Sequence, residues 1–186
     1  MLLDTPNCDI GMSAPPFSLP DFDGKITKLD DFEIKNGLLV AFICNHCPYV
    51  KAIADNLVTD AKLLQEAGID VVAIMPNDYE HYPADNPVAM KHFAEEKGFS
   101  FPYLIDEDQS VARVYGAVCT PDFFGFNRQR ELQYRGRLDD TKVSKGRLGP
   151  DKRRSAELVS AMLSIAETGK GPEDQVPSMG CSIKWR

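Results

Sequence analysis

One unbroken apolar run and one apolar stripe organise this chain. Residues 38–43 (LLVAFI) contain β-branched and aromatic members, which is typical of a strand buried on both faces. Residues 69–75 (IDVVAIM) predict a second buried strand. Between the two strands, apolar residues recur at helical spacing and predict a helix that ends at Gly68; they are Val50, Ile53, Ala54, Leu57, Ala61 and Leu64.

Shorter patterns predict the remaining elements. Residues 17–19 and 25–29 are expected to form two strands around a turn, because Asp23-Gly24 is a hairpin signal. Residues 1–16 and the tail after Gly169 resemble loops. We expect helices at 86–98, 108–115 and 155–168, a strand at 101–105, and an antiparallel pair at 122–126 and 132–135. This order predicts one domain over residues 1–186, an α/β fold with a mixed central β-sheet flanked by helices, an N-terminal β-hairpin extension and a C-terminal tail.

The amino-acid composition and net charge exclude several classes of function. The 186 residues are 43% hydrophobic and 26% charged, typical of a globular protein that buries a core without disulfides. A net charge of −7 argues against nucleic acid or an anionic membrane as partner. The first residues lack a basic and an apolar signal region, so we expect a cytoplasmic protein. Five unevenly spaced cysteines do not form a secreted disulfide framework, and in a reducing compartment a close pair indicates catalysis or metal binding.

The candidate chemistry follows the first buried strand directly. Cys44, Asn45, His46 and Cys47 come next in the chain, and Pro48 is placed to open the helix because it lacks the N–H that a first-turn residue leaves unpaired. Cys47 is then the N-cap, where backbone N–H groups and the helix dipole favour a thiolate. His46 either stabilises a neighbouring thiolate electrostatically or faces solvent, and the sequence leaves both open.

A metal site is the alternative use of the same residues. Cys44, His46 and Cys47 offer nitrogen and sulfur ligands to zinc or copper, but a structural zinc site usually has four protein ligands. The other cysteines and histidines are scattered, so we predict no metal and no other cofactor; among them are Cys8, His81, His92 and Cys181.

Two motifs carry a resemblance to a known family. The segments FICNHCPYV and GCSIKW, with the less specific DGK and LDDF near the N-terminus, are similar to peroxiredoxin-like thioredoxin family proteins. These belong to the redoxin branch that contains the alkyl hydroperoxide reductase/thiol-specific antioxidant superfamily. The resemblance covers about residues 10–186, from Ile10 to the terminus, and implies a thioredoxin fold.

The resemblance also implies roles for individual residues. Aligned on Phe42, the thioredoxin nucleophile falls on Cys47, whereas the second thioredoxin cysteine falls on Val50. The partner thiol here is therefore Cys44, and a shorter loop would instead make Cys44 the first cysteine. Thr120-Pro121 matches the threonine and cis-proline that face the thiols and bind substrate backbone. The implied activity is thiol–disulfide exchange, with a protein or small-molecule disulfide as substrate and a cellular thiol as reductant.

A thiol peroxidase is the second function that the resemblance suggests. Peroxiredoxins resembling this chain carry Pro-x-x-x-Thr-x-x-Cys and a distant arginine, and the threonine and arginine polarise the peroxide. If Cys47 is the peroxide-reacting cysteine, Cys44 occupies the threonine position and Thr120-Pro121 occupies the region that supplies the arginine. We expect Arg135 to solvate the last hairpin. Peroxidase chemistry therefore ranks below disulfide exchange.

The tail at residues 169–186 is not typical of a disordered segment. Ile183 and Trp185 supply apolar area that a solvated tail does not need, so we expect the tail to pack on the domain with Trp185 largely buried. Cys181 and Cys119 are candidate auxiliary thiols. The bolder expectation places Cys181 near enough to Cys47 to act as a second resolving thiol, whereas Cys119 is expected to be a packed core thiol.

Overall fold

A five-stranded mixed sheet lies at the centre of the computed structural model, which describes residues 1–6, 9–141, 143–144, 147–148 and 154–186. Its strand order is β6-β5-β4-β8-β9; the strands are β4 (Leu38–Phe42), β5 (Asp70–Met75), β6 (Tyr103–Ile105), β8 (Asp122–Phe126) and β9 (Leu132–Tyr134). β4, β5 and β6 run parallel, and β8 pairs antiparallel with β4 and β9. The predicted mixed sheet is confirmed.

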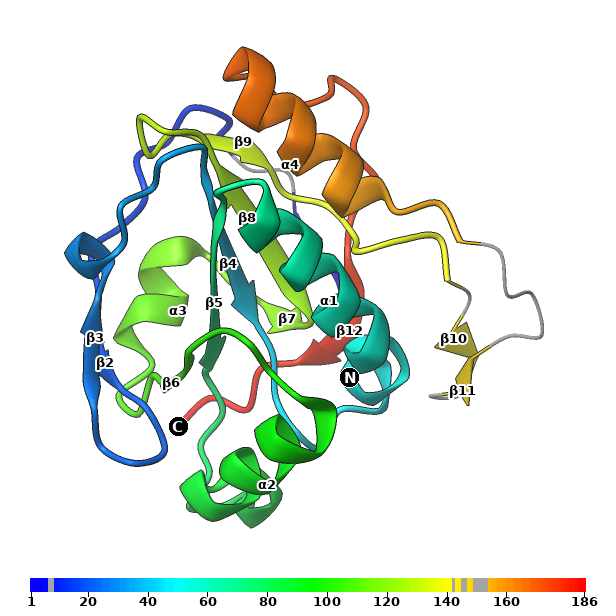
Figure 1. Cartoon of the computed structure of the whole chain (residues 1–186). Coiled ribbons are helices and arrows are strands. Elements are labelled where there is room, and N and C mark those ends of the chain that lie inside the picture. Colours follow the sequence, from blue (N-terminus) through cyan, green and yellow to red (C-terminus); the bar gives the residue numbers. More distant parts are fainter. Residues whose placement is uncertain (7–8, 142, 145–146, 149–153) are drawn as a thin grey trace.

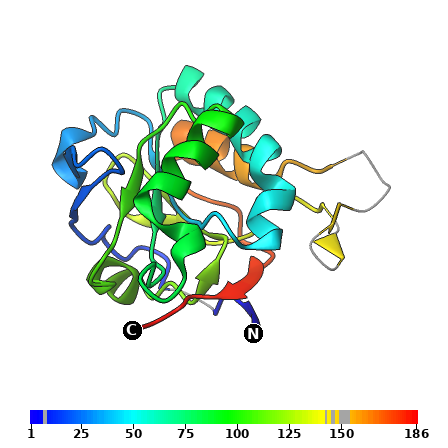
Figure 2. The same ribbon diagram turned by 90° about the horizontal axis from the view of Figure 1, so that it is seen from below.

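Helices cover both faces of this sheet (Figure 1). One face carries α1 (Pro48–Glu66), α2 (Pro87–Lys97) and α4 (Glu157–Thr168), which lie together in Figure 2. The other face carries α3 (Ser110–Tyr115) and the antiparallel hairpin of β2 (Ser18–Pro20) and β3 (Ile26–Lys28).

The two helical layers explain why the central strand is apolar throughout. Leu39, Ala41 and Ile43 pack into the core under α1, whereas Leu38, Val40 and Phe42 pack into the core on the α3 side. Successive side chains of a strand point to opposite faces, so a strand buried on both faces needs apolar residues at every position. This strand delivers the CNHC segment that follows it.

The residues predicted to begin and end helices α1 and α2 cap these helices in the structure. Cys47 is the N-cap of α1 and Pro48 its first residue. Asn86 caps α2, accepting a hydrogen bond from the Ala89 N–H at 2.8 Å, and Gly98 ends that helix at a φ of 70°. Such a left-handed residue after a helix favours glycine, which has no Cβ to clash.

A second, three-stranded sheet joins both ends of the chain, and the sequence did not predict it. Its order is β1-β12-β7; the strands are β1 (Leu2–Asp4), β12 (Met179–Ser182) and β7 (Cys119–Thr120). Both pairings are antiparallel, and Figure 2 shows β12 beside the N-terminal segment. The sequence predicts loops for these two terminal segments, because β1 and β12 are too short to show an apolar-polar alternation and each pairs with residues far away in the chain.

The expected burial of Trp185 is wrong. Its side chain is 37% exposed, and one ring face is covered by the guanidinium of Arg113 at 4.3 Å from the ring centroid. Ile183 instead supplies the buried apolar area, at 3% exposure, within the core on the α3 side. The backbone around Lys184 is held by two hydrogen bonds to its carbonyl oxygen, from the Asp78 N–H at 2.9 Å and the Gln109 side chain at 2.8 Å.

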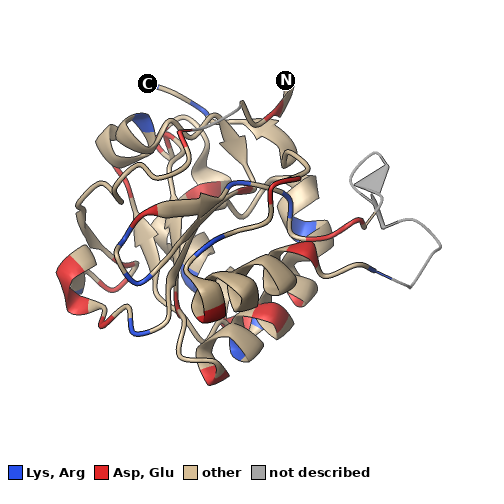
Figure 3. Ribbon diagram, turned by 90° about the horizontal axis from the view of Figure 1, so that it is seen from above, with Lys and Arg blue, Asp and Glu red and all other residues tan. Residues whose placement is uncertain are grey.

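Short elements complete the described chain. They are the 3-10 helices η1 (Leu29–Asp31) and η2 (Pro83–Asp85) and the pair β10 (Val143–Ser144) and β11 (Arg147–Leu148). Within the described ranges, no helix combines the length and apolarity that a membrane span requires. Acidic and basic positions are interspersed along the ribbon in Figure 3, and acidic residues outnumber basic ones in the whole chain.

Candidate functional site

The CNHC segment lies where β4 ends and α1 begins, as the sequence predicted. Cys44 and Cys47 both have no exposed surface, so two thiols are enclosed at the carboxyl end of a central strand. This position brings the thiols against the N-terminus of α1 and against β7, which carries Thr120.

Cys47 is strongly acidified by its neighbours. Its pKa falls from 9.0 to about 5, chiefly because the Cys44 thiol donates a hydrogen bond to it, and burial opposes this fall. Hydrogen bonds from the Val50 N–H in the first turn of α1, and from the thiol and the N–H of Cys181, lower the pKa further. A thiolate that accepts several N–H and S–H donors is stabilised relative to the thiol.

Cys44 shows the opposite shift. Its pKa lies well above 9.0 because it donates to Cys47, because it is buried, and because the carboxylate of Asp85 is close. The Cys44 sulfur also lies 3.2 Å from the Thr120 hydroxyl, and this contact lowers the pKa by less. The pair of shifts therefore favours the proton on Cys44 and the negative charge on Cys47.

Asp85 organises the loop between the two thiols, and the sequence analysis missed it. This fully buried carboxylate accepts hydrogen bonds from the Asn45 N–H at 2.8 Å, the His46 N–H at 3.1 Å and the Asn77 amide at 2.8 Å. It also bonds the His46 ring nitrogen Nδ1 at 2.5 Å. The only sequence signal was an acidic residue in a polar loop 76–86, which is too common to single out.

His46 faces Asp85 and the loop that carries it. Its ring stacks on Tyr82 with centroids 6.1 Å apart, and its side chain is 27% exposed. Its role in stabilising the thiolate stays a prediction. Pro48 lies at the first position of α1, as predicted.

The ligand group that the structure brings together differs from the one inferred from the sequence. Donor atoms of Cys44, His46 and Asp85 lie within 4.8 Å of one another, so among the described residues Asp85 replaces Cys47 in the predicted ligand group. Three donors fall short of the four that structural zinc uses, and both Asp85 oxygens already accept hydrogen bonds. The donor set therefore fits a resident metal poorly.

Thr120 contacts both thiols, and the bond between Thr120 and Pro121 is cis, as predicted. The Thr120 carbonyl oxygen lies 3.2 Å from the Cys47 sulfur and accepts from the protonated thiol. Thr120 does not present a free strand edge, however. β12 pairs with β7, with Cys181 opposite Thr120 and Ser182 opposite Cys119. The tail thus occupies the position expected for substrate backbone.

The remaining cysteines have different surroundings. Cys181 is partly exposed and lies beside Cys47; burial and its hydrogen bond to Cys47 raise its pKa to about 11. Cys119 is fully buried, with its sulfur 3.6 Å from the Pro121 carbonyl oxygen, and burial followed by the charge of Asp122 raises its pKa strongly. Cys8 lies outside the described residues.

Arg135 does not solvate the hairpin, contrary to expectation. It is 8% exposed and pairs with the buried Asp122 at 2.9 Å, and it also donates to the Gly116 carbonyl oxygen at 2.7 Å. Burial raises the pKa of Asp122 to about 6 against the opposing effect of this ion pair. The guanidinium is therefore bound to protein groups rather than presented to the thiols.

A cavity of about 380 Å³ adjoins the same region. Tyr49 of the first turn of α1, Pro121, Phe123 and Met179 line it together with Asp4 and Arg137. Its lining thus combines the residue after the cis bond with the start of the helix that carries Cys47.

Known proteins that are similar in sequence are named as peroxiredoxins and thiol-disulfide oxidoreductases. Residues 10–135 match the AhpC/TSA family. The chain is 32% identical to "Peroxiredoxin Bcp" of Escherichia coli (strain K12) over 115 residues, 62% of this chain and 69% of that protein. It is 27% identical to "Thiol-disulfide oxidoreductase ResA" of Bacillus cereus (strain ATCC 10987 / NRS 248) over 119 residues, 62% of each chain.

Solved structures cover more of the chain. The crystal structure of an uncharacterized conserved protein from Geobacillus kaustophilus has a TM-score of 0.92 at 41% identity, covering 100% of this chain and 97% of that one. The thioredoxin domain of a thiol-disulfide oxidoreductase from Bacteroides vulgatus has a TM-score of 0.58 at 18% identity, covering 69% and 89%. The thioredoxin fold expected from the motifs is confirmed.

Proposed function

The chain belongs to the AhpC/TSA family, and on that premise we propose that it is a thiol–disulfide oxidoreductase whose reacting dithiol is Cys47 and Cys44. Similar proteins are named as peroxiredoxins and thiol-disulfide oxidoreductases, which supports an oxidoreductase as the general class. The observation that carries the finer proposal is that two thiols meet Thr120 at the start of α1: Cys44 lies 3.2 Å from its hydroxyl and the N-cap Cys47 lies 3.2 Å from its carbonyl oxygen. The lowered pKa of Cys47 and the raised pKa of Cys44 agree with this assignment.

The reaction follows from where the proton and the charge lie. The Cys47 thiolate attacks one sulfur of a substrate disulfide, forms a mixed disulfide and expels the other substrate sulfur as a thiolate, which takes a proton from water. Cys44 then attacks the Cys47 sulfur and its proton goes to the second departing substrate thiolate. A Cys44–Cys47 disulfide remains, and two electrons have passed to the substrate. A cellular thiol reductant restores the dithiol.

Thiol peroxidase activity is the alternative, favoured by the similarity to a peroxiredoxin. Peroxide cleavage needs donors that polarise the O–O bond, and here the residue three positions before Cys47 is the thiol Cys44 instead of a threonine. The nearby Arg135 is bound to Asp122 and Gly116. Both observations support disulfide exchange over peroxide reduction.

The rates at which a disulfide and hydrogen peroxide oxidise Cys47 distinguish a thiol–disulfide oxidoreductase from a peroxidase. Fast mixing of the reduced protein with a small disulfide or with hydrogen peroxide gives the rate of Cys47 oxidation in each case. We expect disulfide exchange to be lost in Cys47→Ser, to leave no Cys44–Cys47 disulfide in Cys44→Ser, and to be unchanged in the control Cys119→Ser. Oxidation by peroxide much faster than that of an ordinary exposed thiolate at the same pH would make the protein a peroxidase instead.

A further inference from the structure

The enclosure of the reacting thiols limits how other molecules reach them. Among the four described cysteines, Cys44, Cys47 and Cys119 are buried and Cys181 alone is partly exposed. Thiol–disulfide exchange requires the attacking sulfur to touch the sulfur it attacks. Cys181 is therefore the most accessible sulfur among them for a reductant from solvent.

Backbone pairing of the tail holds Cys181 close to the reacting thiols. Cys181 is directly opposite Thr120 in the β12–β7 pair, and the Thr120 carbonyl oxygen lies 3.2 Å from the Cys47 sulfur. On its other edge β12 pairs with β1, with Cys181 opposite Leu2. Just before β12, the Ser178 hydroxyl donates to the Pro121 carbonyl oxygen at 2.8 Å. Strand pairing on both edges therefore fixes the backbone of Cys181 opposite the residue that contacts the Cys47 sulfur.

We propose that Cys181 is a third catalytic thiol, which forms a disulfide with Cys47 and is the sulfur at which an external thiol reductant attacks. This inference rests on the proposed function, since it needs Cys47 as the nucleophile. It gives the tail a chemical role in the reaction.

The steps balance with the substrates already named. In the mixed disulfide between Cys47 and a substrate sulfur, Cys181 attacks the Cys47 sulfur, and its proton goes to the departing substrate thiolate. Cys181 also attacks the Cys47 sulfur of a Cys44–Cys47 disulfide. Its proton passes to the departing Cys44 thiolate, and a Cys47–Cys181 disulfide remains. An external thiolate then attacks Cys181 and expels the Cys47 thiolate. A second external thiol releases Cys181, so that two reductant thiols become one disulfide.

The acidities of the two sulfurs favour this direction of attack. A thiol of low pKa leaves faster, so attack at Cys181 with Cys47 departing is preferred over attack at Cys47 with Cys181 departing. The negative charge of Cys47 is also one cause of the raised pKa of Cys181. Once Cys47 is in a disulfide, this charge is gone, so Cys181 becomes a better nucleophile only after Cys47 has reacted.

The first test looks for the disulfide where Cys44 cannot compete. Cys44→Ser protein is oxidised with a small disulfide and digested with trypsin, which releases Cys47 in peptide 36–51 and Cys181 in peptide 171–184. We expect these peptides to be linked within one chain, and to remain linked in the matched control Cys44→Ser/Cys119→Ser. Cys44→Ser/Cys181→Ser should stop at the mixed disulfide. A mixed disulfide or intermolecular dimers in Cys44→Ser itself would overturn the proposal.

The second test separates the inference from the proposed function. Oxidised wild-type and Cys181→Ser proteins are mixed with a monothiol such as glutathione, and the return of free thiols is followed. We expect re-reduction of Cys181→Ser to be slower by at least about tenfold, because an enclosed sulfur is attacked slowly. Equal rates of re-reduction in both proteins would refute the role of Cys181 without contradicting the Cys44–Cys47 dithiol. Unimpaired disulfide exchange in Cys47→Ser would instead refute the proposed function itself.

Discussion

The chemistry of the site is set by single residues that act on Cys47 and Cys44. The sequence predicted the acidification of Cys47 from its place at a helix N-terminus, and the first-turn N–H of Val50 is one of its causes. The larger cause, the hydrogen bond from Cys44, and the contribution of Cys181 depend on contacts across the fold. The buried Asp85 was likewise beyond sequence reasoning, because a loop acid gives no periodic signal.

A pH titration tests this acidification. The pKa of Cys47 falls from 9.0 to about 5, so the stability gained from the folded thiolate is present above the unfolded pKa and is lost as the pH falls through about 5. Ultraviolet absorbance of the reduced protein should report one thiolate with a midpoint near that pH. The signal should vanish in Cys47→Ser and persist in Cys119→Ser. A midpoint above about 8, near that of a free thiol, would contradict the assignment.

Substitution of Asp85 tests the loop support. In Asp85→Asn one oxygen acceptor becomes a donor that faces existing N–H groups, so we expect a loss of about 1.5–3 kcal/mol in the free energy of unfolding. The pKa of Cys44 should fall, because the Asp85 charge helps to raise it. The control is Asp55→Asn, an exposed carboxylate on α1 whose ion pair with Lys97 contributes little. Equal stability of both variants would show that Asp85 does not hold the loop.

At the scale of elements, strong periodic patterns were predictable and distant pairings were not. The central strands, α1 with its Pro48 start, and α2 between Asn86 and Gly98 were predicted from apolar spacing and cap residues. β1 and β12 have three and four residues and exist because each pairs with strands far away in the chain. Short segments of this kind carry too few positions to show a period.

Two substitutions in the tail test which side chain anchors it. Ile183→Ala should lower the free energy of unfolding by about 2–4 kcal/mol, because a fully packed isoleucine leaves a cavity. Trp185→Ala should cost less, about 1 kcal/mol, since the ring is partly exposed and mainly contacts Arg113. Chemical denaturation of both variants gives the comparison. A larger loss for Trp185→Ala would reverse this account of the tail.

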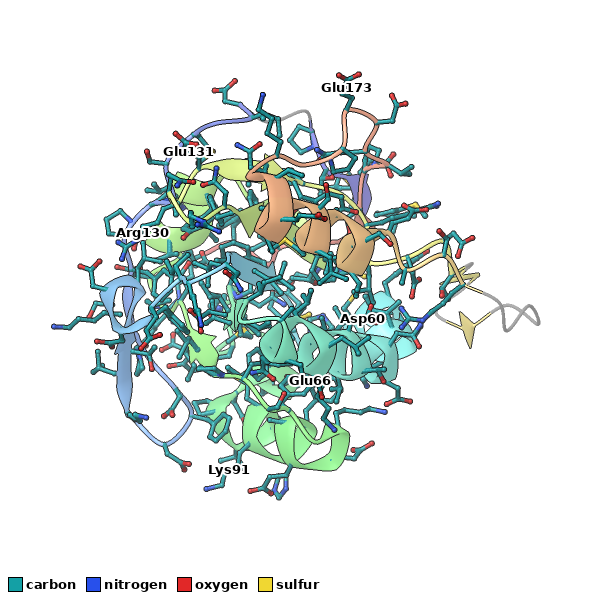
Figure 4. The ribbon with its side chains drawn as sticks, turned by 45° about the horizontal axis from the view of Figure 1, so that its top comes forward. Asp60, Glu66, Lys91, Arg130, Glu131 and Glu173 are labelled. Carbon is teal, nitrogen blue, oxygen red and sulfur yellow. The ribbon has the colours of Figure 1, made fainter. Side chains whose placement is uncertain are left out.

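At the scale of the whole molecule, one buried ion cluster ties α1 to the segment that enters α4. Asp60 on α1, labelled in Figure 4, has no exposed surface and binds Arg154 at 2.5 Å. Arg154 also binds the buried Asp139 at 3.1 Å. The cluster joins parts of the chain that are far apart in sequence, so no local pattern could have revealed it.

Removal of Arg154 should therefore destabilise the fold. Arg154→Met leaves Asp60 buried without its charged partner, and we expect a loss of about 3 kcal/mol in the free energy of unfolding. The matched control is Arg130→Met, because Arg130 (Figure 4) pairs with the exposed Asp30 at the surface and should contribute less than about 1 kcal/mol. Similar losses in both variants would show that burial of Asp60 does not decide the effect.

The most direct test of the central claim is a count of thiols in the mildly oxidised protein, followed by mapping of the disulfide. The account predicts that wild-type protein loses two titratable thiols, that dithiothreitol restores them, and that one of the two is always Cys47, joined to Cys44 within peptide 36–51 or to Cys181 in peptide 171–184. Cys47→Ser should lose no such pair. Free Cys47 after oxidation of the wild type, or an intramolecular disulfide that persists in Cys47→Ser, would contradict the claim that Cys47 is the reacting thiol.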